Sequence, residues 1–154
     1  MNFTRIDQVT ATVLVIESDP LMLTAMGSVM NMQGYRAVLA RTEDVANVAI
    51  ADQTLDVIVL SINELESGCH FAHRLRSHAT SSDTPIIFLV PELKAEWTEK
   101  LSAQGGVYSL LKPIDPHGLL ELVDRVLWMP HLARSRGTAP ENHLNMQADW
   151  IRLN

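Results

Sequence analysis

Short, wholly apolar runs recur along the chain, and a segment with helical spacing follows each of them. Residues 13–16 (Val-Leu-Val-Ile), 57–60 (Val-Ile-Val-Leu) and 86–90 (Ile-Ile-Phe-Leu-Val) carry no polar side chain. A strand is apolar on both of its faces when helices cover both faces of its sheet, as they do in parallel sheets. The runs therefore restrict the chain to folds in which strands and helices alternate.

Two weaker strands and five helices complete the predicted pattern. The strands are expected at residues 13–16, 35–40, 56–60, 86–90 and 107–111, and the helices at 20–33, 43–52, 69–78, 94–103 and 116–128. The first helix has the clearest limits, because Asp19 suits the N-cap, Pro20 the first helical position and Gly34 the C-terminal stop. Strict alternation predicts an α/β fold with a doubly wound, five-stranded parallel sheet, (βα)5, and right-handed crossovers.

Composition divides the chain into an N-terminal extension, a domain and a C-terminal tail, expected at residues 1–11, 12–129 and 130–154. Basic, small and proline residues replace the apolar pattern where the tail begins. Near its end, Met146, Trp150 and Leu153 recur at helical spacing, which predicts a short amphipathic helix. The sequence leaves three alternatives for this segment: packing on its own domain, disorder, or binding to a partner.

Charge and cysteine content narrow the classes of partner. The chain has 154 residues and a formal net charge of −6 at pH 7, which disfavours nucleic acid or an anionic membrane surface. Its single cysteine, Cys69, cannot form an internal disulfide, and the sequence does not begin with a signal-peptide pattern. Cys69, His70 and His73 lie within one predicted helical turn, but a structural metal site normally needs four convergent ligands. A cytoplasmic location is expected.

Several motifs follow the predicted strands in a characteristic order. Residues 15–20 (Val-Ile-Glu-Ser-Asp-Pro) end the first strand, Ser61 ends the third, Pro85 precedes the fourth, and Lys112-Pro113 follows the fifth. With these residues in this order, the chain resembles the bacterial response-regulator receiver domain (CheY-like) over residues 12–127. The resemblance implies a flavodoxin-like arrangement of the sheet and a role in two-component signal transduction.

The chemistry implied by this resemblance depends on acids that the sequence largely lacks. In the family, an acidic cluster after the first strand holds Mg²⁺, and an aspartate at the end of the third strand accepts the phosphoryl group. Here Glu17 keeps one acid, while Ser18 and Ser61 stand where aspartates are expected. A serine hydroxyl is a weak nucleophile without an adjacent general base, so phosphoryl transfer to Ser61 is not expected.

Other positions implied by the family are also changed. Val90 replaces the hydroxyl residue at the end of the fourth strand, and Ser109 replaces the switch aromatic, although Tyr108 lies beside it. Lys112 is retained, and we expect it to pair with Glu17 or Asp19 in place of a phosphoryl group. The site is interpreted as degenerate, without catalytic residues or a cofactor, and with weak Mg²⁺ binding at most by the remnant acids. The degenerate positions are Glu17, Ser18, Ser61, Val90 and Lys112.

The leading hypothesis is an atypical receiver that acts as a phosphorylation-independent protein-interaction module, and not as an enzyme. Its candidate interaction face combines the fourth helix, fifth strand and fifth helix, with Trp97, Tyr108 and Trp128. The expected partners are signalling proteins or a second copy in a homodimer. The alternative is a functional receiver with a non-standard acceptor such as Ser61. A flavodoxin-like enzyme is disfavoured, because residues 17–20 lack the glycines that cradle a nucleotide phosphate.

Overall fold

The computed structural model describes residues 10–128 and 150–153, in which strands and helices alternate as predicted. The strands are β1 (Thr12–Ile16), β2 (Arg36–Ala40), β3 (Val57–Ser61), β4 (Ile86–Val90), β5 (Gly106–Leu111) and β6 (Trp150–Arg152). The helices are α1 (Pro20–Met32), α2 (Glu43–Asp52), α3 (Leu65–Arg76), α4 (Ala95–Ala103) and α5 (Pro116–Trp128), with a short 3-10 turn at Ala79–Ser81.

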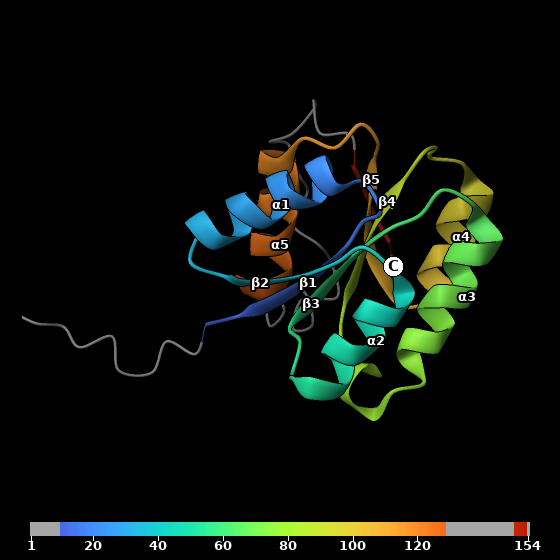
Figure 1. Ribbon diagram of the computed structural model, residues 1–154. Helices are drawn as coiled ribbons and strands as arrows, with labels where there is room; N and C mark the ends of the chain where they lie inside the picture. The colour runs from blue at the N-terminus through green and yellow to red at the C-terminus, as the bar shows by residue number, and fades with distance from the viewer. Residues whose placement is uncertain (1–9, 129–149, 154) are drawn as a thin grey trace, which may run out of the picture.

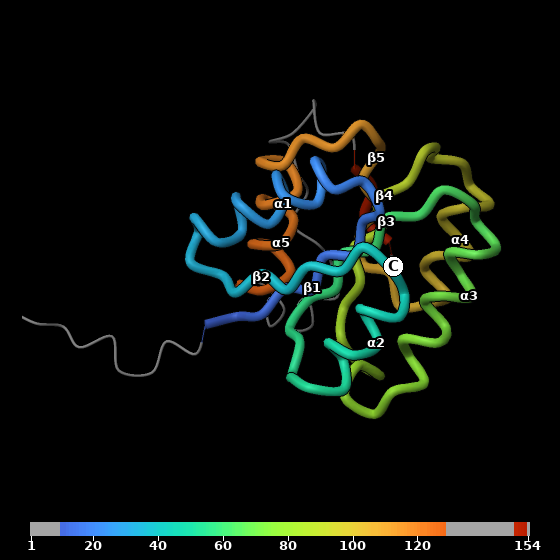
Figure 2. Tube along the Cα trace, in the orientation of Figure 1, coloured from blue at the N-terminus to red at the C-terminus, as the bar shows by residue number. Residues whose placement is uncertain are grey.

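The strands form one sheet in the order β2-β1-β3-β4-β5-β6. Strands β1 to β5 are parallel, and β6 pairs antiparallel with β5. Helices α1 and α5 cover one face of the sheet and α2, α3 and α4 cover the other, as Figure 1 and Figure 2 show. The prediction of a doubly wound α/β fold is confirmed, and β6 extends the sheet beyond the five predicted strands.

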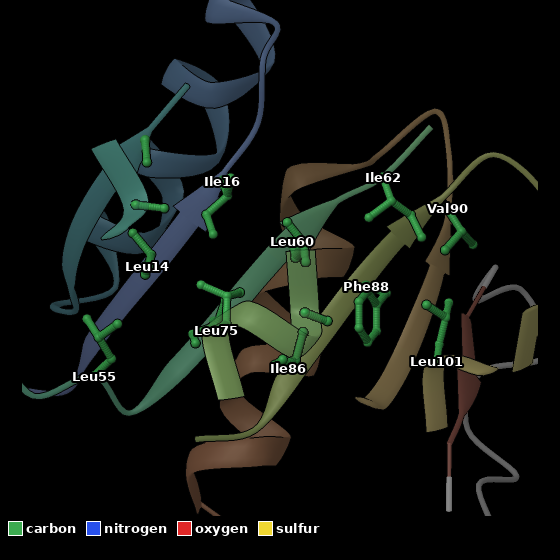
Figure 3. Packing of buried hydrophobic residues seen from close by; sticks show 14 of the residues in the cluster. Leu14, Ile16, Leu55, Leu60, Ile62, Leu75, Ile86, Phe88, Val90 and Leu101 are labelled. Carbon is green, nitrogen blue, oxygen red and sulfur yellow. The ribbon is translucent and has the colours of Figure 1, made fainter. Parts of the chain in front are cut away.

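A separate hydrophobic core lies on each face of the sheet. Leu60, Phe88 and Leu101 are buried in the core beneath α2, α3 and α4, which Figure 3 shows. Met26 and Leu122 are buried in the second core, beneath α1 and α5. Because β3 and β4 contribute side chains to both cores, their sequences are apolar on both faces.

The limits of α1 agree with the sequence signals. The Asp19 carboxylate accepts a hydrogen bond from the backbone amide of Leu21 at 3.0 Å, which caps the first turn. Gly34 follows the helix with φ of 97°, a left-handed conformation that glycine adopts without steric cost. The chain then turns directly into β2.

The buried face of α2 contains only part of its apolar pattern. Val45, Val48 and Ala49 recur at helical spacing, but Val45 is 48% exposed and Val48 62% exposed. The buried residues of this helix are Ala46, Ala49 and Ile50. Two of these three side chains are alanines, so α2 presents a small apolar face to the sheet.

Helix α3 begins at Leu65, four residues before the predicted start at Cys69. Gly68 lies directly before the predicted start, and glycine is a poor helix former. In the structure Gly68 is buried within the helix, and a Cβ atom there would lie 2.7 Å from Cγ2 of Ile62. The glycine allows a close approach between α3 and the chain that follows β3.

The helix predicted for the C-terminal tail is wrong for the residues that the structure describes. Trp150–Arg152 form strand β6, and Leu153 after it is buried. Met146, the other residue of the predicted helical face, lies outside the described residues. The segment is a strand because it pairs with the edge of β5. A local pattern of three apolar positions does not contain this information, so it cannot distinguish a helix from a short edge strand. The predicted domain limits stay a prediction.

Candidate functional site

The register of the sheet brings the predicted site positions to one edge. Ile16 of β1 pairs with Leu60 of β3, so Glu17, directly after β1, and Ser61, the last residue of β3, lie at adjacent strand ends. Ser61 pairs with Leu89 of β4, and the next residue of β4, Val90, pairs with Leu111 of β5, directly before Lys112. This carboxyl edge is where doubly wound sheets place their functional groups.

Lys112 joins the ends of two strands that β4 separates. Its ammonium group donates hydrogen bonds to the carbonyl oxygen of Ile62 at 2.9 Å and to Oδ1 of Asn63 at 3.0 Å. The side chain is half-buried, and this burial lowers the pKa of Lys112, while the negative charge of Glu17 acts in the opposite direction. Among the described residues Lys112 forms no ion pair within 4.0 Å with Glu17 or Asp19, so the expected pairing is limited to the longer-range charge of Glu17, and the hydrogen bonds of Lys112 go to a carbonyl and an amide oxygen.

The remaining acids after β1 are engaged with the backbone. Glu17 Oε2 accepts a hydrogen bond from the amide of Ser18 at 3.2 Å, and Asp19 caps α1. Arg41 Nε donates to the carbonyl oxygen of Ser18 at 3.3 Å, which brings a guanidinium group to this loop. Within residues 10–128 and 150–153, no three His, Cys, Asp or Glu side chains are grouped to hold a metal ion.

The donor set at this edge does not fit the Mg²⁺ site that the family implies. Mg²⁺ favours several carboxylate oxygens in octahedral geometry, and it gives up its own water reluctantly. Here the acids after β1 are Glu17 and Asp19, and Asp19 already caps α1. The hydroxyls of Ser18 and Ser61 are neutral, and the Ile62 carbonyl already accepts from Lys112. Weak Mg²⁺ binding stays a prediction.

Ser61 and Val90 provide little chemistry for phosphoryl transfer. Ser61 is half-buried at the end of β3, and in the described part of the chain no imidazole or carboxylate accepts a hydrogen bond from its hydroxyl. Val90 is fully buried in the same core as Ile62, and Figure 3 shows this core. An activated nucleophile needs a base within hydrogen-bond reach, and an isopropyl side chain cannot bind a phosphoryl oxygen.

The three aromatic residues of the candidate interaction face lie in different surroundings. Trp97 of α4 is buried in the core beneath α2, α3 and α4. Tyr108 of β5 packs against the opposite core and meets the ring of Trp150 edge-on, with centroids 5.2 Å apart. Trp128, at the end of α5, is 70% exposed, and its indole nitrogen donates to the Tyr35 hydroxyl at 2.9 Å. Of the three, Trp128 presents the largest exposed surface.

Sequence reasoning missed the contacts that tether α5 to the start of β2. The Tyr35 hydroxyl donates to Asp124 while it accepts from Trp128. Burial and the Asp124 carboxylate together raise the pKa of Tyr35 to about 12. Asn63, the amide partner of Lys112, was also missed. Its position two residues after Ser61 was an available signal, because that loop must lie at the same sheet edge.

These features define a CheY-like α/β domain whose edge groups follow the ends of β1, β3, β4 and β5. The sequence matches the response regulator receiver domain family over residues 13–124, and the chain belongs to this family. It is therefore a signalling module, a receiver domain of two-component signalling. In the described ranges, no helix combines the length and apolar composition that a membrane crossing requires.

Several solved structures are similar to this chain over nearly their whole length. The chemotaxis protein CheY4 of Vibrio cholerae shares 26% identity, with 77% of this chain and 99% of that one covered and a TM-score of 0.71. A response regulator of Thermotoga maritima shares 22% identity, with 77% of this chain and 98% of that one covered and a TM-score of 0.70. The non-phosphorylated HemR receiver domain of Leptospira biflexa shares 20% identity, with 86% of this chain and 99% of that one covered and a TM-score of 0.68. No curated protein matches the sequence.

Proposed function

We propose that this receiver domain is an atypical one that works as an interaction module in two-component signalling without being phosphorylated. The observation that carries the proposal is Ser61 at the end of β3, where the family resemblance implies the acceptor aspartate. A hydroxyl there has neither the charge that binds Mg²⁺ nor a base that activates it. Val90 and Ser18 remove two further groups on which phosphoryl transfer relies.

The contacts of Lys112 support a single, constitutive conformation. In a phosphorylated receiver, the resemblance implies that this lysine contacts the phosphoryl group. Here two oxygen acceptors already lie at 2.9 and 3.0 Å from its ammonium group. A ligand shifts a conformational equilibrium only by its differential affinity for the two states. A site that binds neither Mg²⁺ nor phosphate tightly supplies no such difference, so the proposed module does not switch by phosphorylation.

The proposed function resides on the surface, and its partners are signalling proteins or a second copy of the chain. Trp128 is the aromatic residue best suited to anchor a partner, because it is largely exposed and large rings dominate the binding energy of many interfaces. The hydrogen bond to Tyr35 fixes its indole ring, so little side-chain entropy is lost on binding. We place the module in the cytoplasm, in keeping with its family role.

A comparison of three variants tests the surface role. Trp128→Arg is expected to weaken self-association or capture of partner proteins, measured by light scattering and by binding assays in extract of the native host. Ser61→Ala is expected to change neither. Tyr35→Phe is the matched comparison, because it removes the hydrogen bond that fixes Trp128 but leaves the exposed ring, and it is expected to weaken binding less than Trp128→Arg does. Equal losses for Trp128→Arg and Ser61→Ala would contradict the proposal.

The alternative is a receiver that accepts a phosphoryl group on Ser61. It is favoured by one observation: Ser61 is not sealed in the core but is half-buried at the edge where Lys112 lies. In that case the mass of the chain would increase when a small phosphodonor is present, and Ser61→Ala would abolish the increase.

A further inference from the structure

Strand β6 closes the edge of the sheet at β5. Leu110, Ser109 and Tyr108 pair antiparallel with Trp150, Ile151 and Arg152. The backbone amide of Leu153 extends this pairing by donating to the carbonyl oxygen of Val107 at 2.7 Å. An open β5 edge would expose a row of unpaired backbone groups that other chains can pair with. The chain's own C-terminal segment therefore occupies an edge that is suited to strand addition.

One face of the β5 edge holds a socket for Leu153. Gly106 has no side chain, and a Cβ atom there would lie 2.8 Å from Cδ1 of Leu153 and 2.7 Å from Cε2 of Phe88. The backbone oxygen of Leu101, in α4, is 2.8 Å from the same point. Leu153 fills this space and is 3% exposed. The glycine thus creates room for a leucine that arrives from a distant part of the sequence.

The opposite face of the edge holds Trp150. Its ring meets Tyr108 edge-on at 88°, and the guanidinium carbon of Arg125 lies 5.4 Å from the ring centroid. Edge-on aromatic pairs and cation–π contacts are both attractive, so these two neighbours favour the ring at this position. Ile151 and Arg152, between the two anchors, are exposed. The segment therefore packs against both faces of the sheet, Trp150 on one face and Leu153 on the other.

From these contacts we propose that the β5 edge is an acceptor site for an extended segment with tryptophan and, three residues later, leucine. The chain's own residues 150–153 are its resident occupant. A partner that adds a strand at β5 must displace them, so the tail competes with such partners. The inference rests on the proposed function, because it names the kind of partner that the interaction module takes.

The covalent connection between α5 and β6 explains why the chain's own segment normally outcompetes a free segment for the β5 edge. Residues 129–149 connect α5 to β6 in sequence, so β6 always remains near its own β5 edge. Tethering of this kind gives an effective concentration in the mM range. A free peptide at μM concentration therefore binds the wild-type chain weakly, even when its intrinsic affinity for the edge is the same.

The test uses the full-length chain and a fluorescent synthetic peptide with the sequence of residues 148–154. Leu153→Asp in the protein is expected to release the resident strand, because a carboxylate cannot be buried beside Phe88 without a partner. The peptide should then bind at least about tenfold more tightly to this variant than to the wild-type chain, by fluorescence anisotropy. Ile151→Asp is the matched control, because it adds the same charge at an exposed position. A peptide that carries the Leu153→Asp change should not bind.

Hydrogen exchange of the wild-type chain gives a second, independent measurement. If β6 leaves β5 without global unfolding, the amides of Ile151 and Leu153 exchange faster than those of β4. Equal protection of β6 and β4 would overturn the proposal, as would a Leu153→Asp chain that does not fold. Equal peptide binding by the wild-type and Leu153→Asp chains, or no binding to a folded Leu153→Asp chain, would overturn it as well. Phosphorylation of Ser61 would contradict the proposed function and would not alter these results.

Discussion

The ammonium group of Lys112 lies 3.0 Å from Oδ1 of Asn63, in the loop that follows β3. This contact joins the ends of β3 and β5 across β4, at the edge where the family implies phosphoryl chemistry. Lys112 is half-buried, and protein oxygens accept both of the hydrogen bonds that its ammonium group donates.

Changing the acceptor at residue 63 should change the protonation of Lys112. Asn63→Asp places a carboxylate next to the ammonium group, so it is expected to raise the pKa of Lys112 and to add about 0.5–1 kcal/mol of stability at pH 7. Asn63→Ala removes an acceptor and is expected to lower the pKa further. NMR titration of the Lys112 side chain measures both effects. Identical titration curves in all three chains would show that the Asn63 contact does not persist in solution.

Stability at alkaline pH should depend on Tyr35. The pKa of its hydroxyl is raised from 10.0 to about 12 in the folded chain, so the folded state keeps a proton that the unfolded state loses. The free energy of unfolding is therefore expected to fall as pH rises from about 10 to about 12. Tyr35→Phe should remove this fall and cost about 1–2 kcal/mol at pH 7, because Asp124 and Trp128 lose their partner.

Urea denaturation of the wild-type and Tyr35→Phe chains across this pH range measures both changes. Tyr108→Phe serves as the control, since it keeps the ring that packs on Trp150 and leaves the Tyr35 contacts intact. A Tyr35→Phe chain with the same alkaline loss of stability as the wild type would contradict the assignment to Tyr35.

The fold was predictable because local patterns and tertiary burial agree in most elements. The apolar runs of β1, β3 and β4 required cover on both faces, and α1 and α5 supply it on one side of the sheet. Prediction failed where a distant contact decides the structure. The segment at Trp150 became a strand because β5 offers an unpaired edge and Gly106 offers space for Leu153. Neither is visible within the segment itself.

The candidate site was predictable in its positions but not in its contacts. The ends of the strands placed Glu17, Ser61, Val90 and Lys112 at one edge, as their register requires. The partner of Lys112 was missed, because sequence reasoning paired charge with charge. A backbone carbonyl, such as that of Ile62, has no sequence signature, and its position depends on where the loop after β3 turns.

Filling the space at Gly106 should disturb the β5–β6 edge. Gly106→Ala is expected to cost about 1–3 kcal/mol, because the added methyl group meets Phe88, Leu153 and the backbone oxygen of Leu101 below normal contact distance. Gly118→Ala is the matched control. A Cβ atom at Gly118, which lies within α5, would have Oδ2 of Asp115 as its nearest neighbour at 3.7 Å, so this change should stabilise the chain by about 0.5 kcal/mol. Thermal unfolding measures both, and equal effects would contradict the socket described for Leu153.

Restoring one acid should not restore phosphoryl transfer. Ser61→Asp alone is expected to remain unmodified by acetyl phosphate, because Ser18 and Val90 still lack a metal ligand and a phosphate-binding hydroxyl. The triple variant Ser18→Asp, Ser61→Asp, Val90→Thr is expected to gain a phosphoryl group in the presence of Mg²⁺. If Ser61→Asp alone is readily phosphorylated, Ser18 and Val90 do not prevent phosphoryl transfer, which would contradict this explanation.

The most direct test of phosphorylation-independent function is the intact mass of the wild-type chain after incubation with acetyl phosphate and Mg²⁺. Ser61→Ala, which cannot accept a phosphoryl group at residue 61, is treated in parallel. If the chain works without phosphorylation, both proteins keep the mass of the unmodified protein. A phosphoryl adduct on the wild-type chain that is absent from Ser61→Ala would contradict it.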